Sequence, residues 1–174
     1  AISPFALHEV VKGVASTAIG LLKDKPVRLY QEIEPDLPNV AGDEFRTRQA
    51  LLNLVSNAAK FTPQGTITIA CFRADVDGVP MVQVSVTDTG IGIPRDKLDL
   101  IFEPFQQADN NAARQYEGTG LGLPISRKLI EKQGGRMWVD SEIGVGSTFS
   151  FALPIAGLET GEQASSEASA EIGD

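Results

Sequence analysis

One stretch of the sequence decides the fold: Leu52-Asn53-Leu54-Val55-Ser56-Asn57-Ala58-Ala59-Lys60-Phe61-Thr62. It ends a segment, residues 43–61, whose apolar residues predict a helix packed against a core. Asn53, Asn57 and Lys60 interrupt the apolar residues at intervals of four and three, so they share one helix face. Amide oxygens suit Mg²⁺, and a lysine ammonium suits a phosphate. This face therefore predicts a metal–phosphate site, with an exposed polar face as the alternative.

A second segment is rich in glycine: Gly118-Thr119-Gly120-Leu121-Gly122-Leu123. Glycines at alternate positions let backbone N–H groups face an anion, and the helix predicted over about 122–133 adds its positive end. The segment lacks the Gly-Lys-Ser/Thr of a P-loop and the third glycine of the dinucleotide fingerprint. Taken alone, it fits a tight loop as well as a phosphate site.

A third segment, Asp88-Thr89-Gly90-Ile91-Gly92-Ile93, follows an apolar strand predicted over 81–87. A carboxylate at the end of a buried strand needs a hydrogen-bond donor, and the exocyclic amine of adenine is one. We expect Gly90 and Gly92 to let the base approach the backbone and Ile93 to supply an apolar wall. The alternative is a solvated turn.

The rest of the chain predicts an α+β fold, a two-layer α/β sandwich in which a mixed sheet of about five strands packs on three helices. The first helix is expected to start with Ser3 as cap and Pro4 in its first turn, and to end before Pro26. A loop is expected up to about Gly42, and Asp77-Gly78 predicts a hairpin turn. The other expected elements are helices over 43–61, 94–101 and 122–133 and strands over 27–33, 66–74, 81–87, 136–141 and 147–153.

The net charge of -8 argues against a nucleic-acid partner. Residues 157–174 hold five acidic residues and no Lys or Arg, so we expect an acidic disordered tail after a domain that spans 1–156. No apolar run is long enough to cross a bilayer, and no signal peptide is evident, so we expect no membrane contact by this domain. The single cysteine, Cys71, excludes an intrachain disulfide and suits the cytoplasm.

Together, the three segments resemble the GHKL ATP-binding superfamily, and within it the catalytic and ATP-binding domain of bacterial sensor histidine kinases. Residues 52–62 resemble that family's N box, 88–93 its G1 box and 118–123 its G2 box. Phe102-Glu103-Pro104-Phe105 resembles its F box, and Gly146-Ser147-Thr148-Phe149 matches its closing strand. The likeness extends over nearly the whole chain up to Pro154.

The resemblance implies ATP and Mg²⁺ as ligands. Asn57 would bind the metal with Asn53 beside it, Asp88 would bind the adenine amine, and Thr148 would assist through an ordered water. A mobile lid is implied over about 103–118, with its hinge anchored by Phe102 and Phe105. The residues implied to bind nucleotide are Asn57, Lys60, Phe61, Asp88, Gly90, Gly92, Ile93, Gly118, Thr119, Gly120, Leu121, Gly122, Leu123 and Thr148. Those implied to act in catalysis are Asn53, Lys60 and Arg114.

Arg114 enters that set because of a departure from the family pattern. Many members carry a basic residue soon after the F box, where this chain has Gln106-Gln107. Arg114 or Lys60 would then supply the positive charge at the γ-phosphate.

Related ATPases of the gyrase and Hsp90 class carry a water-activating glutamate where this chain has Asn53, and an amide cannot accept a proton. The resemblance therefore favours a kinase whose nucleophile is a histidine on a separate helical hairpin, with a response regulator downstream. The sole histidine, His8, lacks the acceptor motif, so we expect no autophosphorylation by this chain alone. An ATPase clamp and a nucleotide-sensing pseudokinase remain the alternatives. The resemblance also implies a cytoplasmic location, either free or as part of a membrane-bound sensor.

Overall fold

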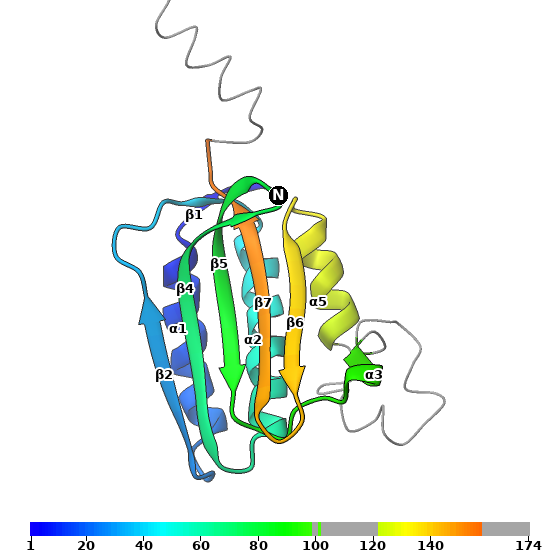
Figure 1. The fold of residues 1–174 in the computed structure, drawn as a ribbon. Helices are drawn as coiled ribbons and strands as arrows, with labels where there is room; N and C mark the ends of the chain where they lie inside the picture. The colour runs from blue at the N-terminus through cyan, green and yellow to red at the C-terminus, as the bar shows by residue number, and fades with distance from the viewer. Residues whose placement is uncertain (99–100, 102–121, 158–174) are drawn as a thin grey trace, which may run out of the picture.

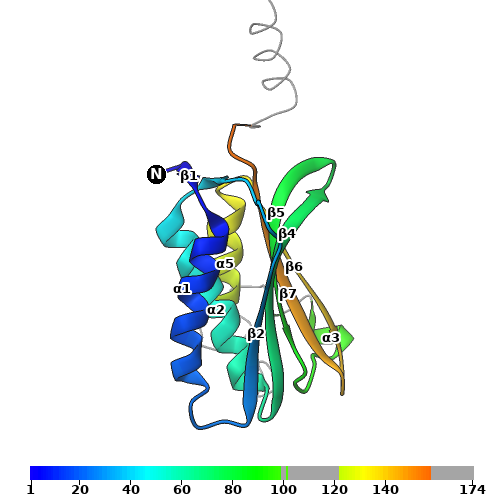
Figure 2. The same ribbon diagram turned by 90° about the vertical axis from the view of Figure 1, so that its left-hand side faces the viewer.

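The fold has two layers, a five-stranded sheet and a set of helices that covers one of its faces (Figure 1, Figure 2). The structure is a computed structural model, and it describes residues 1–98, 101 and 122–157. Strand β2 pairs in parallel with β4, and the other neighbours are antiparallel, so the mixed five-stranded sheet of the sequence prediction is confirmed. In spatial order the strands are β2 (Val27–Ile33), β4 (Gly65–Val76), β5 (Val79–Asp88), β7 (Gly146–Pro154) and β6 (Arg136–Glu142).

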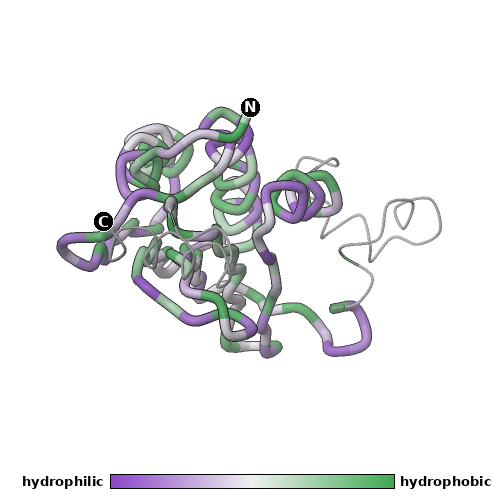
Figure 3. Tube along the Cα trace, turned by 90° about the horizontal axis from the view of Figure 1, so that it is seen from above, coloured by the Kyte–Doolittle hydropathy of each residue, from purple (hydrophilic) through white to green (hydrophobic). Residues whose placement is uncertain are grey.

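Three helices form the second layer: α1 (Leu7–Leu21), α2 (Glu44–Phe61) and α5 (Gly122–Glu131). A short helix, α3 (Arg95–Leu98), lies beyond the edge strand β6 (Figure 1). Helix α2 begins where expected, because the Asp43 carboxylate accepts a hydrogen bond from the Arg46 backbone N–H at 3.1 Å. Seen from above, hydrophilic and hydrophobic residues alternate along the helical turns (Figure 3), as in helices with one face against a sheet.

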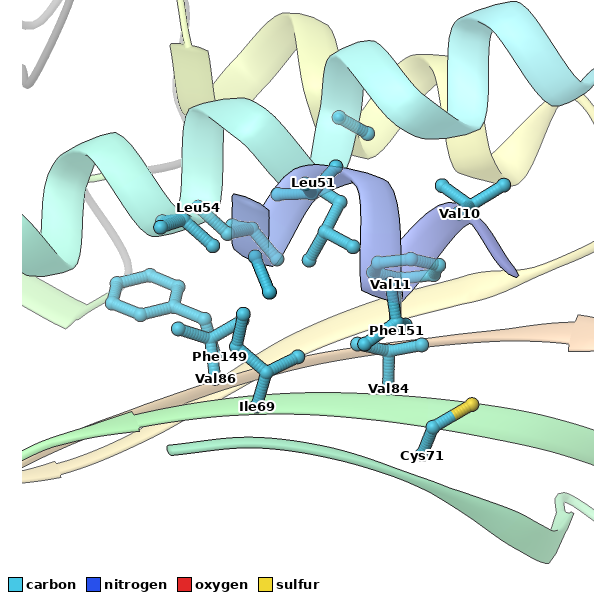
Figure 4. Close-up of a cluster of buried hydrophobic side chains, with 14 of the residues drawn as sticks. Val10, Val11, Leu51, Leu54, Ile69, Cys71, Val84, Val86, Phe149 and Phe151 are labelled. Carbon is cyan, nitrogen blue, oxygen red and sulfur yellow. The ribbon is translucent and has the colours of Figure 1, made fainter. Parts of the chain in front are cut away.

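The core lies between the two layers (Figure 4). Alternate residues of β4, β5 and β7 point toward the helices, so Ile69, Val84 and Phe151 meet the apolar faces of α1 and α2. Asp88 continues the inward row of β5 at its carboxyl end. The same alternation that builds the core therefore carries one carboxylate to the helical side of the sheet.

The amino-terminal prediction was wrong. Ser3 and Pro4 do not begin a helix; they belong to strand β1 (Ser3–Phe5), which pairs antiparallel with β3 (Val40–Gly42) inside the expected loop. This pairing buries Phe5, and the helix starts only at Leu7, after Ala6 has served as an N-cap without a side-chain hydrogen bond. Long-range strand pairing thus outweighs the local capping signal.

The turn prediction at Asp77-Gly78 is confirmed. Both residues have positive φ, 53° and 81°, as a two-residue hairpin between β4 and β5 requires. Among the described residues, no helix is both long and apolar enough to cross a membrane.

Candidate nucleotide-binding site

The predicted site residues gather at one end of the sandwich, drawn at the bottom of Figure 1. Strand β5 ends there at Asp88, α2 ends there at Phe61, and α5 begins there at Gly122. The turn between β6 and β7 closes the same end. Segments far apart in the sequence are thus brought together by the fold.

Asp88 is a buried hydrogen-bond acceptor at this end. Its side chain is only 4% exposed, and Oδ1 accepts a hydrogen bond from the Gly90 N–H at 2.9 Å. Burial raises the pKa of the Asp88 carboxyl above its ordinary value, while the backbone N–H groups of Gly90 and Ser147 oppose that rise. A carboxylate that bears a desolvation cost is well suited to a ligand that brings a donor.

Gly90 and Gly92 lie against protein backbone. A Cβ added to Gly90 would lie 2.3 Å from the Phe61 carbonyl oxygen, and one added to Gly92 would lie 2.2 Å from that of Glu142. Gly92 also has a φ of 76°, which favours glycine. Both glycines are therefore needed for the loop after β5 to pack between α2 and the end of β6. From the sequence alone, we expected the same glycines to let the base approach the backbone.

Ile93 ends this loop and is 4% exposed. Its N–H donates a 2.7 Å hydrogen bond to the Ser141 hydroxyl, and the role of Ile93 as an apolar wall for the base stays a prediction. The Ile91 carbonyl in turn accepts from the Gly144 N–H at 3.0 Å. The loop is thus fixed at two points, one on β6 and one on the β6–β7 turn.

Helix α2 contributes two amides in different environments. Asn57 is 1% exposed, and neither its Oδ1 nor its Nδ2 has a hydrogen-bond partner among the described residues. Because Asn57 is buried, the alternative of a simple exposed polar face does not apply to it, and a buried amide of this kind ordinarily has a hydrogen-bond partner. Asn53 is half-buried, and its Nδ2 donates to the Ser126 hydroxyl of α5 at 3.0 Å.

Lys60 and Phe61 end α2 at the same place. The Lys60 side chain is exposed, and its ammonium lies 6.0 Å from the centre of the Phe61 ring. Phe61 is half-buried, and its carbonyl accepts from the Ile91 N–H at 3.3 Å. Lys60 thus places a positive charge at this end of α2.

The glycine-rich segment is described only at its end. Gly122 opens α5 as expected, and Leu123 is buried at 3% exposure. Arg114, the predicted lid at 103–118, and Gly118, Thr119, Gly120 and Leu121 lie outside the described residues, as does the tail from 158. Their roles remain predictions.

Thr148 is not brought to Asp88. It faces Thr87 across the ladder, and their hydroxyls are 3.0 Å apart on the side of the sheet away from the helices. Ser147 is the residue opposite Asp88, and it is 6% exposed. The hydroxyl on the same face as Asp88 therefore belongs to Ser147, which is not among the predicted site residues, although alternation from Asp88 through the strand pairing indicates it.

His8 lies far from this end. It sits in the first turn of α1, and α1 begins at the end of the sandwich opposite to the end where β5 and α2 finish (Figure 1). Its Nε2 lies 3.6 Å from the Glu9 carboxylate, and its Nδ1 is buried without a partner among the described residues. That His8 is not the phosphoacceptor stays a prediction.

Comparison with known proteins places this geometry in a family. The model of the family "Histidine kinase-, DNA gyrase B-, and HSP90-like ATPase" matches residues 42–157. The sensor histidine kinase RcsC of Escherichia coli (strain K12) is 40% identical over 156 residues, which cover 89% of this chain and 16% of RcsC. The chain therefore spans a small part of that relative.

Solved structures give the same result. The nucleotide-free catalytic domain of histidine kinase ThkA superimposes with a TM-score of 0.73 at 30% identity, covering 89% of this chain and 98% of that domain. Full-length ShkA in complex with AMPPNP gives a TM-score of 0.75 at 33% identity, over 90% of this chain and 31% of ShkA. ThkA in complex with the response regulator protein TrrA gives 0.72 at 28% identity, over 91% of this chain and 43% of that one. The chain belongs to the histidine kinase-, DNA gyrase B- and HSP90-like ATPase family, and within it to the catalytic domains of sensor histidine kinases.

Proposed function

We propose that this domain binds Mg-ATP and donates the γ-phosphate to a histidine on a separate phosphoacceptor hairpin. The observation that carries the proposal is that one end of the sandwich holds both a buried acceptor, Asp88, and a buried amide, Asn57, to which the described residues give no hydrogen-bond partner. Asp88 suits a nucleobase that donates a hydrogen bond, and Asn57 suits a cation bound to the phosphates. A single nucleotide has both features.

Asp88 would bind the adenine amine. Its Oδ1 already accepts from Gly90, and an ionised carboxylate offers further lone pairs but no donor. Ser147 stands opposite Asp88 in the ladder and would take the assisting role first assigned to Thr148. Guanine presents an oxygen where adenine has its amine, so this pocket would disfavour it.

Asn57 would hold Mg²⁺. Its Oδ1 is the kind of oxygen ligand that Mg²⁺ prefers, and binding would supply a partner that the described residues do not give this buried amide. The described residues contain no cluster of three His, Cys, Asp or Glu side chains, so phosphate oxygens and water would complete the shell. Bound there, the ion would neutralise charge on the phosphates.

Asn53 supports a kinase over an ATPase clamp. The hydrogen bond from its Nδ2 to Ser126 holds the side chain between α2 and α5. An amide cannot take a proton from water, and lack of a general base costs about 10²–10⁴-fold in rate. A bound nucleotide would thus be protected from hydrolysis until a stronger nucleophile, an imidazole, arrives. Lys60 at the end of α2, and Arg114, would supply positive charge to the transferred phosphoryl group.

The partners follow from this chemistry. The acceptor histidine would come from a helical hairpin domain of the same kinase, because His8 lies at the wrong end of the fold. A response regulator would take the phosphoryl group next, as the ThkA complex with TrrA suggests by analogy. Both steps would take place in the cytoplasm.

Phosphotransfer in trans tests the proposal. The chain is incubated with γ-labelled ATP and Mg²⁺, with and without the hairpin domain of the same kinase produced separately. We expect almost no phosphate release and no label on the chain alone, and acid-labile, base-stable label on the hairpin when both are present. Brisk hydrolysis by the chain alone would instead support the ATPase clamp. ATP binding without any transfer would support the pseudokinase.

A further inference from the structure

Ser141 of β6 makes three hydrogen bonds at the base end of the site. Its Oγ accepts from the Ile93 N–H at 2.7 Å, donates to the Gly146 carbonyl at 3.1 Å, and lies 2.7 Å from the Ser147 Oγ. Ser141 is not among the site residues that the family resemblance implies, and the proposed phosphate transfer gives its hydroxyl no role. One half-buried side chain of β6 thus ties the loop after β5 to the start of β7.

These segments form the surface that would meet the base. Asp88 begins the loop that Ile93 ends, and Ser147 lies opposite Asp88 in the β5–β7 ladder. Ile93 and Ser147 are 4% and 6% exposed, so water cannot replace a lost hydrogen bond at either residue. The position of the apolar wall and that of the Ser147 hydroxyl both depend on Ser141.

We propose that Ser141 is a positioning residue that fixes Ile93 and Ser147 relative to Asp88, and that it thereby sharpens the choice of adenine over a 6-oxopurine. The inference rests on the proposed function. Hypoxanthine presents an oxygen toward Asp88. If Ile93 and Ser147 are held rigidly, the base cannot move away, and its oxygen stays in repulsive contact with the carboxylate. A wall that can move lets the wrong base shift away from the carboxylate, so discrimination falls.

The test compares ATP with inosine triphosphate by calorimetry for the wild-type chain, Ser141→Ala and Ser150→Ala. Ser150 is a matched control, because it lies in β7, is 2% exposed, and pairs its hydroxyl with that of Ser85 at 2.8 Å on the other face of the sheet. We expect Ser141→Ala to lower the ratio of the two dissociation constants about tenfold, the effect of losing one well-positioned hydrogen bond. Ser150→Ala should leave the ratio unchanged.

The ratio separates positioning from stability. Partial unfolding weakens both nucleotides by the same factor and leaves their ratio unmoved. Ser141→Thr, which retains the hydroxyl, should keep a ratio close to that of the wild type. If the wild type discriminates clearly between the two nucleotides and Ser141→Ala shows the same ratio of dissociation constants, this inference alone is overturned. If the wild-type ratio is near one, the proposed function is overturned as well.

Hydrogen exchange on the wild-type chain tests the contact without any substitution. The Ile93 amide should exchange slowly, because Ser141 accepts its hydrogen bond in a buried setting. Fast exchange at Ile93 within an otherwise protected loop would overturn the inference, even if Ser141→Ala does not fold.

Discussion

Asp88→Asn separates nucleotide binding from stability at a single position. The asparagine keeps the shape of the side chain and the Oδ1 that accepts from Gly90 at 2.9 Å, so the loop after β5 should keep its conformation. The variant replaces the acceptor that faces the base with an N–H₂ donor. Adenine would then present a donor to a donor.

The expected loss follows from the burial of Asp88. A hydrogen bond to a charged group contributes about 1.5–3 kcal/mol, and at 4% exposure no water can take the place of the lost partner. At 25 °C this corresponds to ATP affinity about 10- to 150-fold weaker. GTP affinity should change much less.

Stability should move the other way. Burial raises the pKa of Asp88 above its ordinary 3.8, so at neutral pH the ionised carboxylate costs folding free energy. The nucleotide-free variant should therefore be at least as stable as the wild type at pH 7. This difference should disappear as the pH falls through the raised pKa and below 3.8, because the carboxyl is then protonated in both the folded and unfolded states.

Calorimetry with ATP and urea unfolding at several pH values measure the two effects. Asp140→Asn is the matched control, since Asp140 is exposed on β6 opposite Thr148 and carries the same charge. Unchanged ATP affinity in Asp88→Asn would refute the adenine assignment. A clear loss of stability at pH 7 without nucleotide would refute the argument from burial.

Three further predictions concern the rest of the domain. Asn57→Ala should abolish the effect of Mg²⁺ on ATP affinity, measured by calorimetry. It should not lower the midpoint of urea unfolding, because the amide has no partner to lose among the described residues. An ATP affinity that still depends on Mg²⁺ would contradict the metal assignment. Phe151→Ala should cost about 3–5 kcal/mol of unfolding free energy in urea, since its ring is fully buried between the layers, and a loss below about 1 kcal/mol would contradict the described core. Burial raises the pKa of the Cys71 thiol to about 12, and the negative charge of Glu34 adds to the rise. A thiol reagent at pH 8 should therefore react slowly with the folded protein and rapidly with the protein unfolded in urea. Equal rates would contradict the burial of Cys71.

The local sequence patterns were sufficient for most of the fold. Helical spacing in residues 43–61 and alternation in β4 and β5 predicted elements of both layers. The resemblance to the ATP-binding family, rather than these patterns, assigned Asn57 and Asp88 to one nucleotide site. The pairing of β1 with β3 was not predictable in this way, because it joins residues about forty positions apart and overrides a local cap at Ser3.

The site shows a similar limit. The sequence identified the loop after Asp88 but not why its glycines are needed, since the carbonyls of Phe61 and Glu142 that exclude side chains come from distant segments. Thr148 was chosen without the strand register, and a shift of one residue transfers a side chain to the other face of a sheet. Ser147 and Ser141 become evident only when β5, β6 and β7 are paired.

The most direct test of the account is calorimetry of the wild-type chain with ATP and GTP, each with and without Mg²⁺. We expect micromolar-range binding of Mg-ATP and at least about tenfold weaker binding of GTP, because Asp88 would face an oxygen. ATP should bind more weakly when Mg²⁺ is removed, because Asn57 then has no ion to bind. Equal affinity for ATP and GTP, or ATP affinity that does not depend on Mg²⁺, would contradict these expectations.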